Sequence, residues 1–168
     1  GWMHTTSDVD IIDEFEETIV RNKKGINYKY GNELRSLDSF EVVLKYKNAN
    51  NIGSKKFMAY RTHHGPVTHA SGNIWLSTAM MWDPVKALQQ SFLRTKNSNQ
   101  KEFDKMMDIR TNSSNNTVYA AADGNIAYYH GNFIPKRDPG FDYKKPVDGS
   151  NPKTDWKGLH DLRDNIFL

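Results

Sequence analysis

The sequence predicts an α+β fold for this chain of 168 residues. Three observations predict it: strand-like patterns fill the first half, two segments with helical signals follow, and a further pair of strands comes after them. Strands grouped in runs, instead of alternating strictly with helices, are typical of α+β proteins. A chain of this length can bury one sizeable core, so we expect a single domain-sized segment.

Four segments of the first half are predicted strands: 11–20, 39–46, 57–67 and 73–81. In 39–46, large apolar residues alternate with mostly polar ones, which is the period of a half-buried strand. The dipeptide Gly31-Asn32 predicts a hairpin turn between the first two strands. The polar run 47–56 is expected to be a turn, and Gly65-Pro66 should end the third strand.

Two helices are predicted after these strands. Asp83-Pro84 supplies an N-cap and a proline at the first helical position, so the first helix should extend to about Thr95. Its expected apolar stripe is Ala87, Leu88, Ser91 and Phe92. The second helix should start near Ser98. Its apolar face, at positions i, i+3 and i+4, is Phe103, Met106 and Met107.

The stretch 117–137 is a predicted strand pair around an Asp-Gly turn, with unusually small residues for a sheet interior. These small residues are Ala120, Ala121, Ala122 and Ala127. From Pro135 to Pro152 the repeated prolines and glycines predict a long irregular excursion.

Composition excludes several functional classes. The net charge is only +3 and the basic residues are scattered, with no arginine-rich stripe, so we expect no nucleic-acid partner. There are no cysteines, which excludes disulfides and thiolate zinc sites. No apolar run approaches the ~18 residues of a membrane span.

Histidines cluster in the stretch THHGPVTH, which contains His63, His64 and His69. Imidazole is a common zinc ligand, so a histidine-dependent metal protein is one hypothesis. In a regular strand, however, His63 and His64 would point to opposite faces. We therefore favour packing and hydrogen bonding at the end of a strand.

Acidic residues gather between Asp8 and Glu17. They could form a solvated face, or they could bind calcium, which takes carboxylate and carbonyl oxygens. Asp10 and Asp13 would lie on opposite faces of a regular strand, so a shared ion requires a bend at Ile11-Ile12. A G-x-S-x-G motif is absent, and the residues alone indicate no catalytic nucleophile.

Several motifs, in the same order along nearly the whole chain, carry a resemblance to a known family. They are the segments GWMHTTSDVDIIDEFEE and YRTHHGPV, then Tyr119-Ala120, Gly124-Asn125-Ile126-Ala127-Tyr128, Pro135-Lys136-Arg137, Pro146-Val147 and Trp156-Lys157-Gly158. Together they resemble the penicillin acylase family of N-terminal-nucleophile hydrolases. The resemblance implies a fragment of a four-layer αββα fold, in which two sheets stack face to face. In that fold Ala120, Ala122 or Ala121, and Ala127 would let a neighbouring layer approach closely.

The resemblance also implies a mechanism. An N-terminal serine would attack an amide, with its own α-amino group as the base. On this chain the serine would lie upstream of Gly1 and the oxyanion-binding asparagine downstream of Leu168. The match leaves one catalytic group here, the backbone N–H of Thr6, as an oxyanion donor. The isolated chain should therefore be inactive.

The family's calcium site corresponds to Asp10 and Asp13 as carboxylates and to the carbonyls of Ile12 and Tyr143, with further ligands from outside the chain. Partners would be a small-molecule amide substrate and the rest of the acylase chains, in the periplasm or outside the cell. The sequence departs from the family pattern at Met3, His4 and Thr5, and it has Ala121 where the family usually has Asp. The identity of the acyl group in the substrate therefore stays open among penicillin-like, N-acyl amino acid and N-acyl homoserine lactone amides. The alternative is a binding or structural domain that kept the fold and lost the nucleophile.

Overall fold

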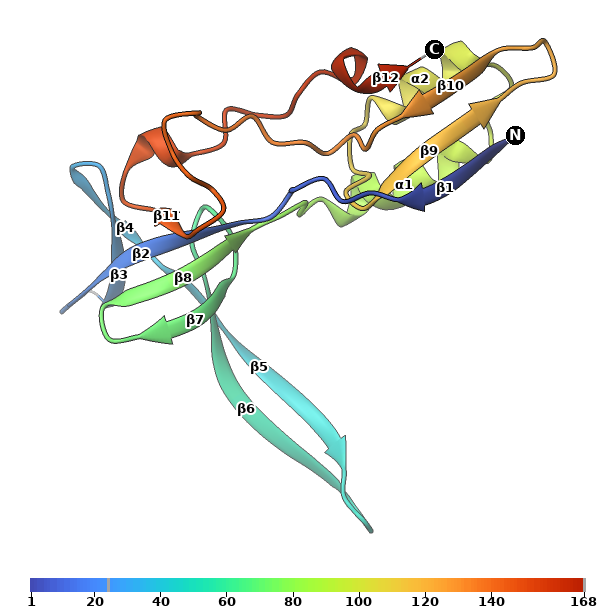
Figure 1. Cartoon of the computed structure of the whole chain (residues 1–168). Coiled ribbons are helices and arrows are strands. Elements are labelled where there is room, and N and C mark those ends of the chain that lie inside the picture. The colour runs from blue at the N-terminus through green and yellow to red at the C-terminus, as the bar shows by residue number, and fades with distance from the viewer. Residues whose placement is uncertain (24, 168) are drawn as a thin grey trace. The chain divides into compact units, whose positions relative to one another are not determined.

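The computed structural model describes residues 1–23 and 25–167 and divides the chain into two compact units (Figure 1). The first unit contains Gly1–Ile12, Met81–Lys136 and the residues from Trp156 onward. The second contains Asp13–Met80 and Arg137–Asp155. This division was not expected from the sequence, and each unit is described by itself below.

The first unit is an antiparallel sheet in the order β1-β9-β10-β12, with helices against one face (Figure 1). Its elements are β1 (Trp2–Thr6), α1 (Pro84–Arg94), α2 (Gln100–Met107), β9 (Asn115–Ala120), β10 (Ile126–Tyr129), a 3-10 turn (Leu162–Asn165) and β12 (Ile166–Phe167). The core between helix and sheet consists of Phe103, Met106, Met107, Tyr119, Ala127, Tyr129 and Leu162.

The first helix begins at its predicted cap, Asp83, and the second begins at Gln100, close to the start predicted near Ser98, with Asn99 as its cap. The Asp83 side chain accepts a hydrogen bond from the Lys86 N–H, and the Asn99 side chain accepts one from the Glu102 N–H. Each bond satisfies an N–H that has no partner inside the first turn. The predicted apolar face of α2 is confirmed, because all three of its residues are buried in the core.

The predicted stripe of α1 is wrong. Leu88 and Phe92 are 72% and 64% exposed, and the buried residue of this helix is Gln90. The Gln90 carbonyl oxygen accepts hydrogen bonds from the Thr111 N–H at 2.8 Å and from its hydroxyl at 2.5 Å. The Gln90 amide can be buried because its carbonyl oxygen is hydrogen-bonded. The buried face of α1 therefore carries a polar residue, and the spacing of apolar residues predicted the wrong face.

The sheet face opposite the helices is open in the described part of the chain. Met3 and Ile126 are 61% and 67% exposed on it, and Ala120 is exposed as well. Ala127 lies on the other face, in the core beneath α2. The layer that packs against Ala127 is therefore the helix α2 and not a second sheet.

The second unit is built on a sheet in the order β4-β3-β2-β8-β7, with β11 pairing in parallel with β2 (Figure 1). Its elements are β2 (Asp13–Asn22), β3 (Gly25–Tyr30), β4 (Glu33–Ser36), β5 (Asp38–Lys47), β6 (Ile52–Arg61), β7 (Val67–Ser71), β8 (Ile74–Ala79), β11 (Val147–Asp148) and a 3-10 turn (Pro152–Thr154). Ile19, Tyr28, Leu37 and Trp75 form its core. The Gly31-Asn32 turn is confirmed between β3 and β4, with Gly31 at a φ of 55°.

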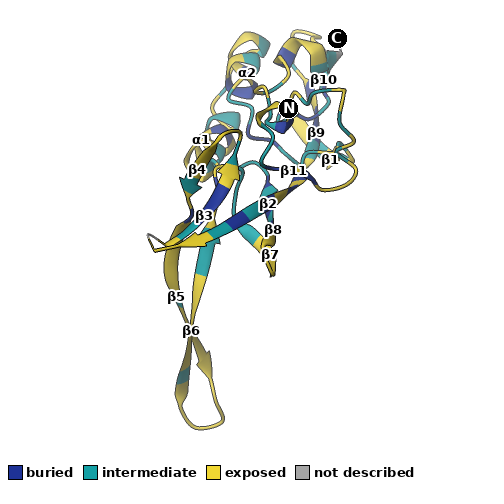
Figure 2. Ribbon diagram, turned by 90° about the vertical axis from the view of Figure 1, so that its left-hand side faces the viewer, coloured by how far each residue is buried: buried dark blue, intermediate teal, exposed yellow. Residues whose placement is uncertain are grey.

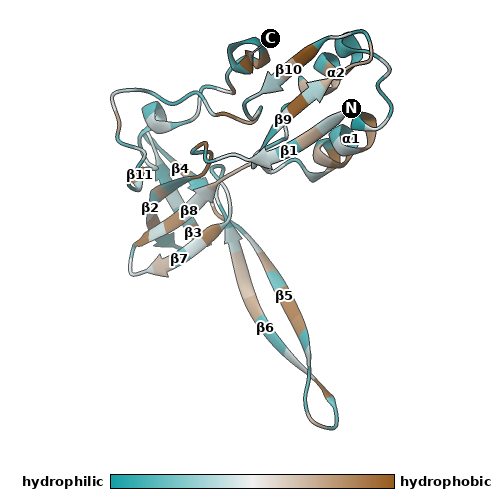
Figure 3. Cartoon of the chain, turned by 45° about the vertical axis from the view of Figure 1, so that its right-hand side comes forward, coloured by the Kyte–Doolittle hydropathy of each residue, from teal (hydrophilic) through white to brown (hydrophobic). Residues whose placement is uncertain are grey.

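Strands β5 and β6 form a separate two-stranded hairpin. The predicted turn 47–56 is mostly strand, because pairing continues to Lys47 and Ile52. Gly53 pairs with Tyr46 across the hairpin, and the Tyr46 ring covers it so closely that a Cβ there would lie 2.7 Å from the ring. The hairpin is exposed along most of its length (Figure 2) and includes apolar stretches (Figure 3). Its exposed large apolar residues are Phe40, Val43, Leu44, Tyr46, Ile52, Phe57 and Met58.

The α+β class is confirmed by these strands and two α-helices. Among the described residues, no helix has both the length and the apolar composition needed to cross a membrane.

Candidate functional site

The expected oxyanion donor, Thr6, is the last residue of β1, an edge strand of the described sheet. Gly1 and Ala120 exchange both backbone hydrogen bonds, and the Ser7 N–H donates to the Ser114 carbonyl at 3.0 Å. Hydrogen-bonded and non-hydrogen-bonded pairs alternate in an antiparallel ladder, so Thr6 occupies a non-hydrogen-bonded position. Its N–H therefore points away from β9, toward the open edge of the sheet.

His4, two residues before Thr6, ties β1 to helix α1. Its Nε2 accepts a hydrogen bond from the Arg94 guanidinium at 2.8 Å, and its Nδ1 lies 3.0 Å from the Thr117 hydroxyl. Burial and the Arg94 charge together lower the pKa of His4 below its ordinary value. The neutral ring can then donate from Nδ1 and accept at Nε2, which fixes the strand that carries Thr6.

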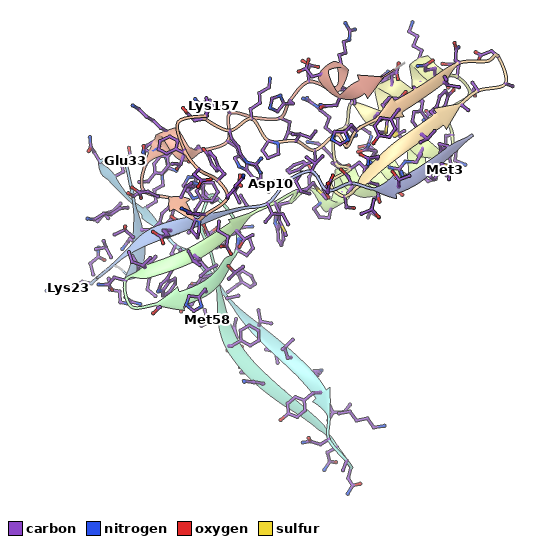
Figure 4. The ribbon with its side chains drawn as sticks, viewed as in Figure 1. Met3, Asp10, Lys23, Glu33, Met58 and Lys157 are labelled. Atoms are coloured by element: carbon purple, nitrogen blue, oxygen red, sulfur yellow. The ribbon has the colours of Figure 1, made fainter. Side chains whose placement is uncertain are left out.

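The four expected calcium ligands are divided between the two units. Asp10, labelled in Figure 4, and Ile12 belong to the first unit and are exposed, whereas Asp13 and Tyr143 belong to the second. Asp13 is 1% exposed, and its Oδ2 accepts a hydrogen bond from the Arg137 Nε at 2.7 Å. The four-ligand set stays a prediction.

A buried carboxylate that sequence reasoning missed lies in the second unit. Glu17 is fully buried in β2, and its Oε1 accepts hydrogen bonds from the hydroxyls of Thr62 and Ser77 at 2.8 and 2.5 Å. The same oxygen lies 2.8 Å from the His64 Nδ1. The sequence did contain a signal for this burial. Glu17 lies two residues after the buried Phe15, on the same face of the strand, whereas Glu16 lies on the opposite face.

The tight turn after β6 holds both histidines. The Thr62 N–H donates to the Gly65 carbonyl at 2.9 Å, and Pro66 pairs with Arg61. Gly65 is required at this point, because a Cβ there would lie 2.0 Å from the Thr78 carbonyl oxygen. The turn places His63 and His64 next to each other.

The expectation that His63 and His64 point to opposite faces is wrong. They lie in the turn and not in the strand, and their ring centroids are 3.8 Å apart. The ring of His64 stacks on Phe15 at 3.8 Å, and the Tyr28 hydroxyl lies 3.1 Å from the His63 Nδ1. The predicted hydrogen bonding at the end of a strand is confirmed.

Asp155 is the last member of the cluster, and it faces the Nε2 atoms of both histidine rings. Its Oδ1 lies 2.9 Å from the His64 Nε2 and 3.6 Å from the His63 Nε2, and its Oδ2 accepts a hydrogen bond from the Tyr30 hydroxyl. His64 therefore has a carboxylate at each ring nitrogen. We refer to Glu17, His63, His64 and Asp155 as the histidine–carboxylate cluster.

Both carboxylates of the cluster favour the ionised form. Burial pushes the pKa of Glu17 upward, but hydrogen bonds from His64, Ser77 and Thr62 outweigh it and hold the pKa below its usual value. The pKa of Asp155 is lowered in the same way: burial opposes the shift, while hydrogen bonds from Tyr30 and His64 favour it. Hydrogen bonding to the charged form is the deciding cause at both sites.

Comparison with known proteins gives the family. A sequence model of penicillin amidase matches residues 1–166. Penicillin G acylase from Escherichia coli is 30% identical over 163 residues, which cover 95% of this chain and 19% of that protein. The chain thus spans about a fifth of the length of that relative.

A solved structure shows the same fold. The thermostable penicillin G acylase from Alcaligenes faecalis superposes with a TM-score of 0.79 and 24% identity, covering 99% of this chain and 30% of that one. Because the family match extends over nearly all residues and the fold agrees, the chain belongs to the penicillin amidase family.

Proposed function

We propose that the chain is part of an amidohydrolase that cleaves a linear amide through an N-terminal serine lying outside the residues of this chain. The observation that supports this most strongly is the family match over residues 1–166. The substrate class we propose is an acylated amine of the penicillin-like, N-acyl amino acid or N-acyl homoserine lactone type.

The contribution of this chain to catalysis would be the backbone N–H of Thr6. Attack on an amide carbonyl places negative charge on its oxygen, and a fixed N–H aimed at that oxygen stabilises the transition state. Thr6 suits this role because its N–H faces the open edge of the sheet, and because the His4–Arg94 bond holds the strand next to α1. A backbone donor does not depend on the side chain, so threonine is acceptable here.

Further segments of the acylase would cover the apolar surfaces of this chain. The open face of the first sheet exposes Met3 and Ile126, and the β5–β6 hairpin exposes side chains such as Ile52, at 76%. A two-stranded hairpin is marginally stable in water by itself. Exposed apolar side chains gathered on one element are typical of protein contacts, which supports the rest of the acylase as partner.

Calcium would support the structure and take no part in the chemistry. The proposed donors are oxygens of carboxylates and carbonyls, as a hard cation prefers, and Asp13 is a buried carboxylate already oriented by Arg137. Asp10, Asp13, Ile12 and Tyr143 would hold the ion together with ligands from outside this chain. We place the protein in the periplasm or outside the cell.

The test is hydrolysis of a panel of chromogenic amides with phenylacetyl, phenoxyacetyl and long-chain acyl groups, together with N-acyl homoserine lactones. The full-length protein should cleave at least one of them, whereas the purified 168-residue chain should cleave none. Cleavage by the chain alone would contradict the proposed position of the nucleophile. Inactivity of the full-length protein on the whole panel would favour the binding or structural alternative.

A further inference from the structure

We propose that His63, His64 and Asp155 form a zinc-binding site in the second unit, separate from the proposed catalytic and calcium residues. One ligand atom from each of these residues can be chosen so that all lie within 4.8 Å of one another. Two imidazoles and one carboxylate are a set that zinc binds in proteins, with a fourth position left for water.

The distances suit an ion of this size. A tetrahedral ion with bonds of about 2.0 Å separates its ligand atoms by about 3.3 Å. The Asp155 Oδ1 lies 2.9 Å from the His64 Nε2 and 3.6 Å from the His63 Nε2, which bracket that separation. Small side-chain rotations would therefore be enough to admit the ion.

Each proposed ligand is also held by an outer partner. The His64 Nδ1 faces the Glu17 carboxylate at 2.8 Å, the His63 Nδ1 faces the Tyr28 hydroxyl at 3.1 Å, and the Asp155 Oδ2 accepts from Tyr30. Metal-binding histidines almost always donate their second N–H to such a group, which fixes the tautomer and aims the ligating nitrogen at the metal. A chance cluster of surface side chains would not be expected to have a partner for every member.

Access and rigidity also agree with metal binding. The side chains of His63 and Asp155 are 27% and 31% exposed, so an ion can reach them, whereas His64 is 5% exposed and anchored by Glu17. The turn that carries both histidines is held by two backbone hydrogen bonds, from the Thr62 N–H to the Gly65 carbonyl at 2.9 Å and from the Thr78 N–H to the Pro66 carbonyl at 3.0 Å. The ligand positions are thus set before the ion arrives, which reduces the cost of ordering them.

The experiment is calorimetric titration of the full-length protein with zinc chloride, in buffer containing excess calcium so that hard-cation sites are filled. We expect one zinc ion per copy of this chain, and cobalt(II) should give the visible absorption of a site with nitrogen and oxygen ligands. His63→Ala should weaken zinc binding by at least about tenfold. His69→Ala is the matched control, because His69 is an exposed histidine on β7 outside the cluster, and it should leave the affinity unchanged.

A second variant guards against misfolding of the first. Tyr30→Phe removes only the hydroxyl that supports Asp155, and it should weaken zinc binding about 10- to 100-fold, as loss of an outer partner does. The proposal is overturned if zinc does not bind, if His63→Ala and Tyr30→Phe both bind zinc as the unmodified protein does, or if His69→Ala causes an equal loss. Amide hydrolysis is measured separately, so failure here leaves the proposed function untouched.

Discussion

Replacing Glu17 by glutamine tests the role of the buried carboxylate in the second unit. The change keeps the shape and removes the charge. Three donors converge on Oε1, from Thr62, Ser77 and His64. A hydrogen bond to a charged group contributes about 1.5–3 kcal/mol and a neutral one about 1 kcal/mol, so three bonds that share one atom should lose about 2–4 kcal/mol together.

The assay is urea unfolding followed by tryptophan fluorescence, since Trp75 lies in this core. Glu16→Gln is the matched control, because Glu16 is the exposed neighbour on the same strand. The pKa of Glu17 is lowered in the folded protein, so its stabilising effect should be present above pH 4.5 and be lost as the pH falls through the folded value. If Glu17→Gln is no more destabilising than Glu16→Gln at neutral pH, the charge on Glu17 does not stabilise this unit.

Three further predictions concern packing, protonation and metal binding. Gly149→Ala should destabilise by about 1–3 kcal/mol in urea unfolding, because a Cβ would lie 2.8 Å from the Glu17 Oε2, and unchanged stability would contradict this contact. The pKa of His4, measured by NMR, should lie below 6.5, and Arg94→Gln should raise it. Because the pKa is lowered in the folded protein, the stability that the neutral ring contributes is present above pH 6.5 and is lost as the pH falls through the folded value. Removal of calcium from the full-length protein with a calcium-selective chelator should lower its melting temperature. Asp13→Asn should reduce the difference between the melting temperatures with and without calcium, and an unchanged melting curve would count against the calcium site.

Local signals predicted those parts of the fold in which chemistry at one or two residues decides the structure. The cap Asp83, the Gly31 turn and the apolar face of α2 each act within a few residues. The failures required knowledge of distant partners. The buried face of α1 depends on a bond from Thr111 to Gln90, and the strand at 52–56 depends on pairing with β5.

The candidate sites also combine residues that local sequence indicated with geometry that depends on distant partners. The resemblance pointed to Thr6 by motif order, and the geometry of its N–H followed only from the pairing of β1 with β9. The histidine–carboxylate cluster joins residues 91 positions apart, from His64 to Asp155, so no spacing rule could have found it. Its local signs were the adjacent histidines of the THHGPVTH stretch and an acidic residue, Glu17, at a core-facing position of a strand.

The proposed role of Thr6 is tested most directly by removing its backbone N–H from the full-length protein. Proline lacks this donor and is tolerated on an edge strand where the N–H faces away from the ladder, so Thr6→Pro should fold. We predict that Thr6→Pro lowers kcat about 100- to 1,000-fold with little change in KM, while Thr6→Ala retains activity. Equal activity in Thr6→Pro and Thr6→Ala would contradict the proposal that this chain supplies an oxyanion donor to an amidohydrolase.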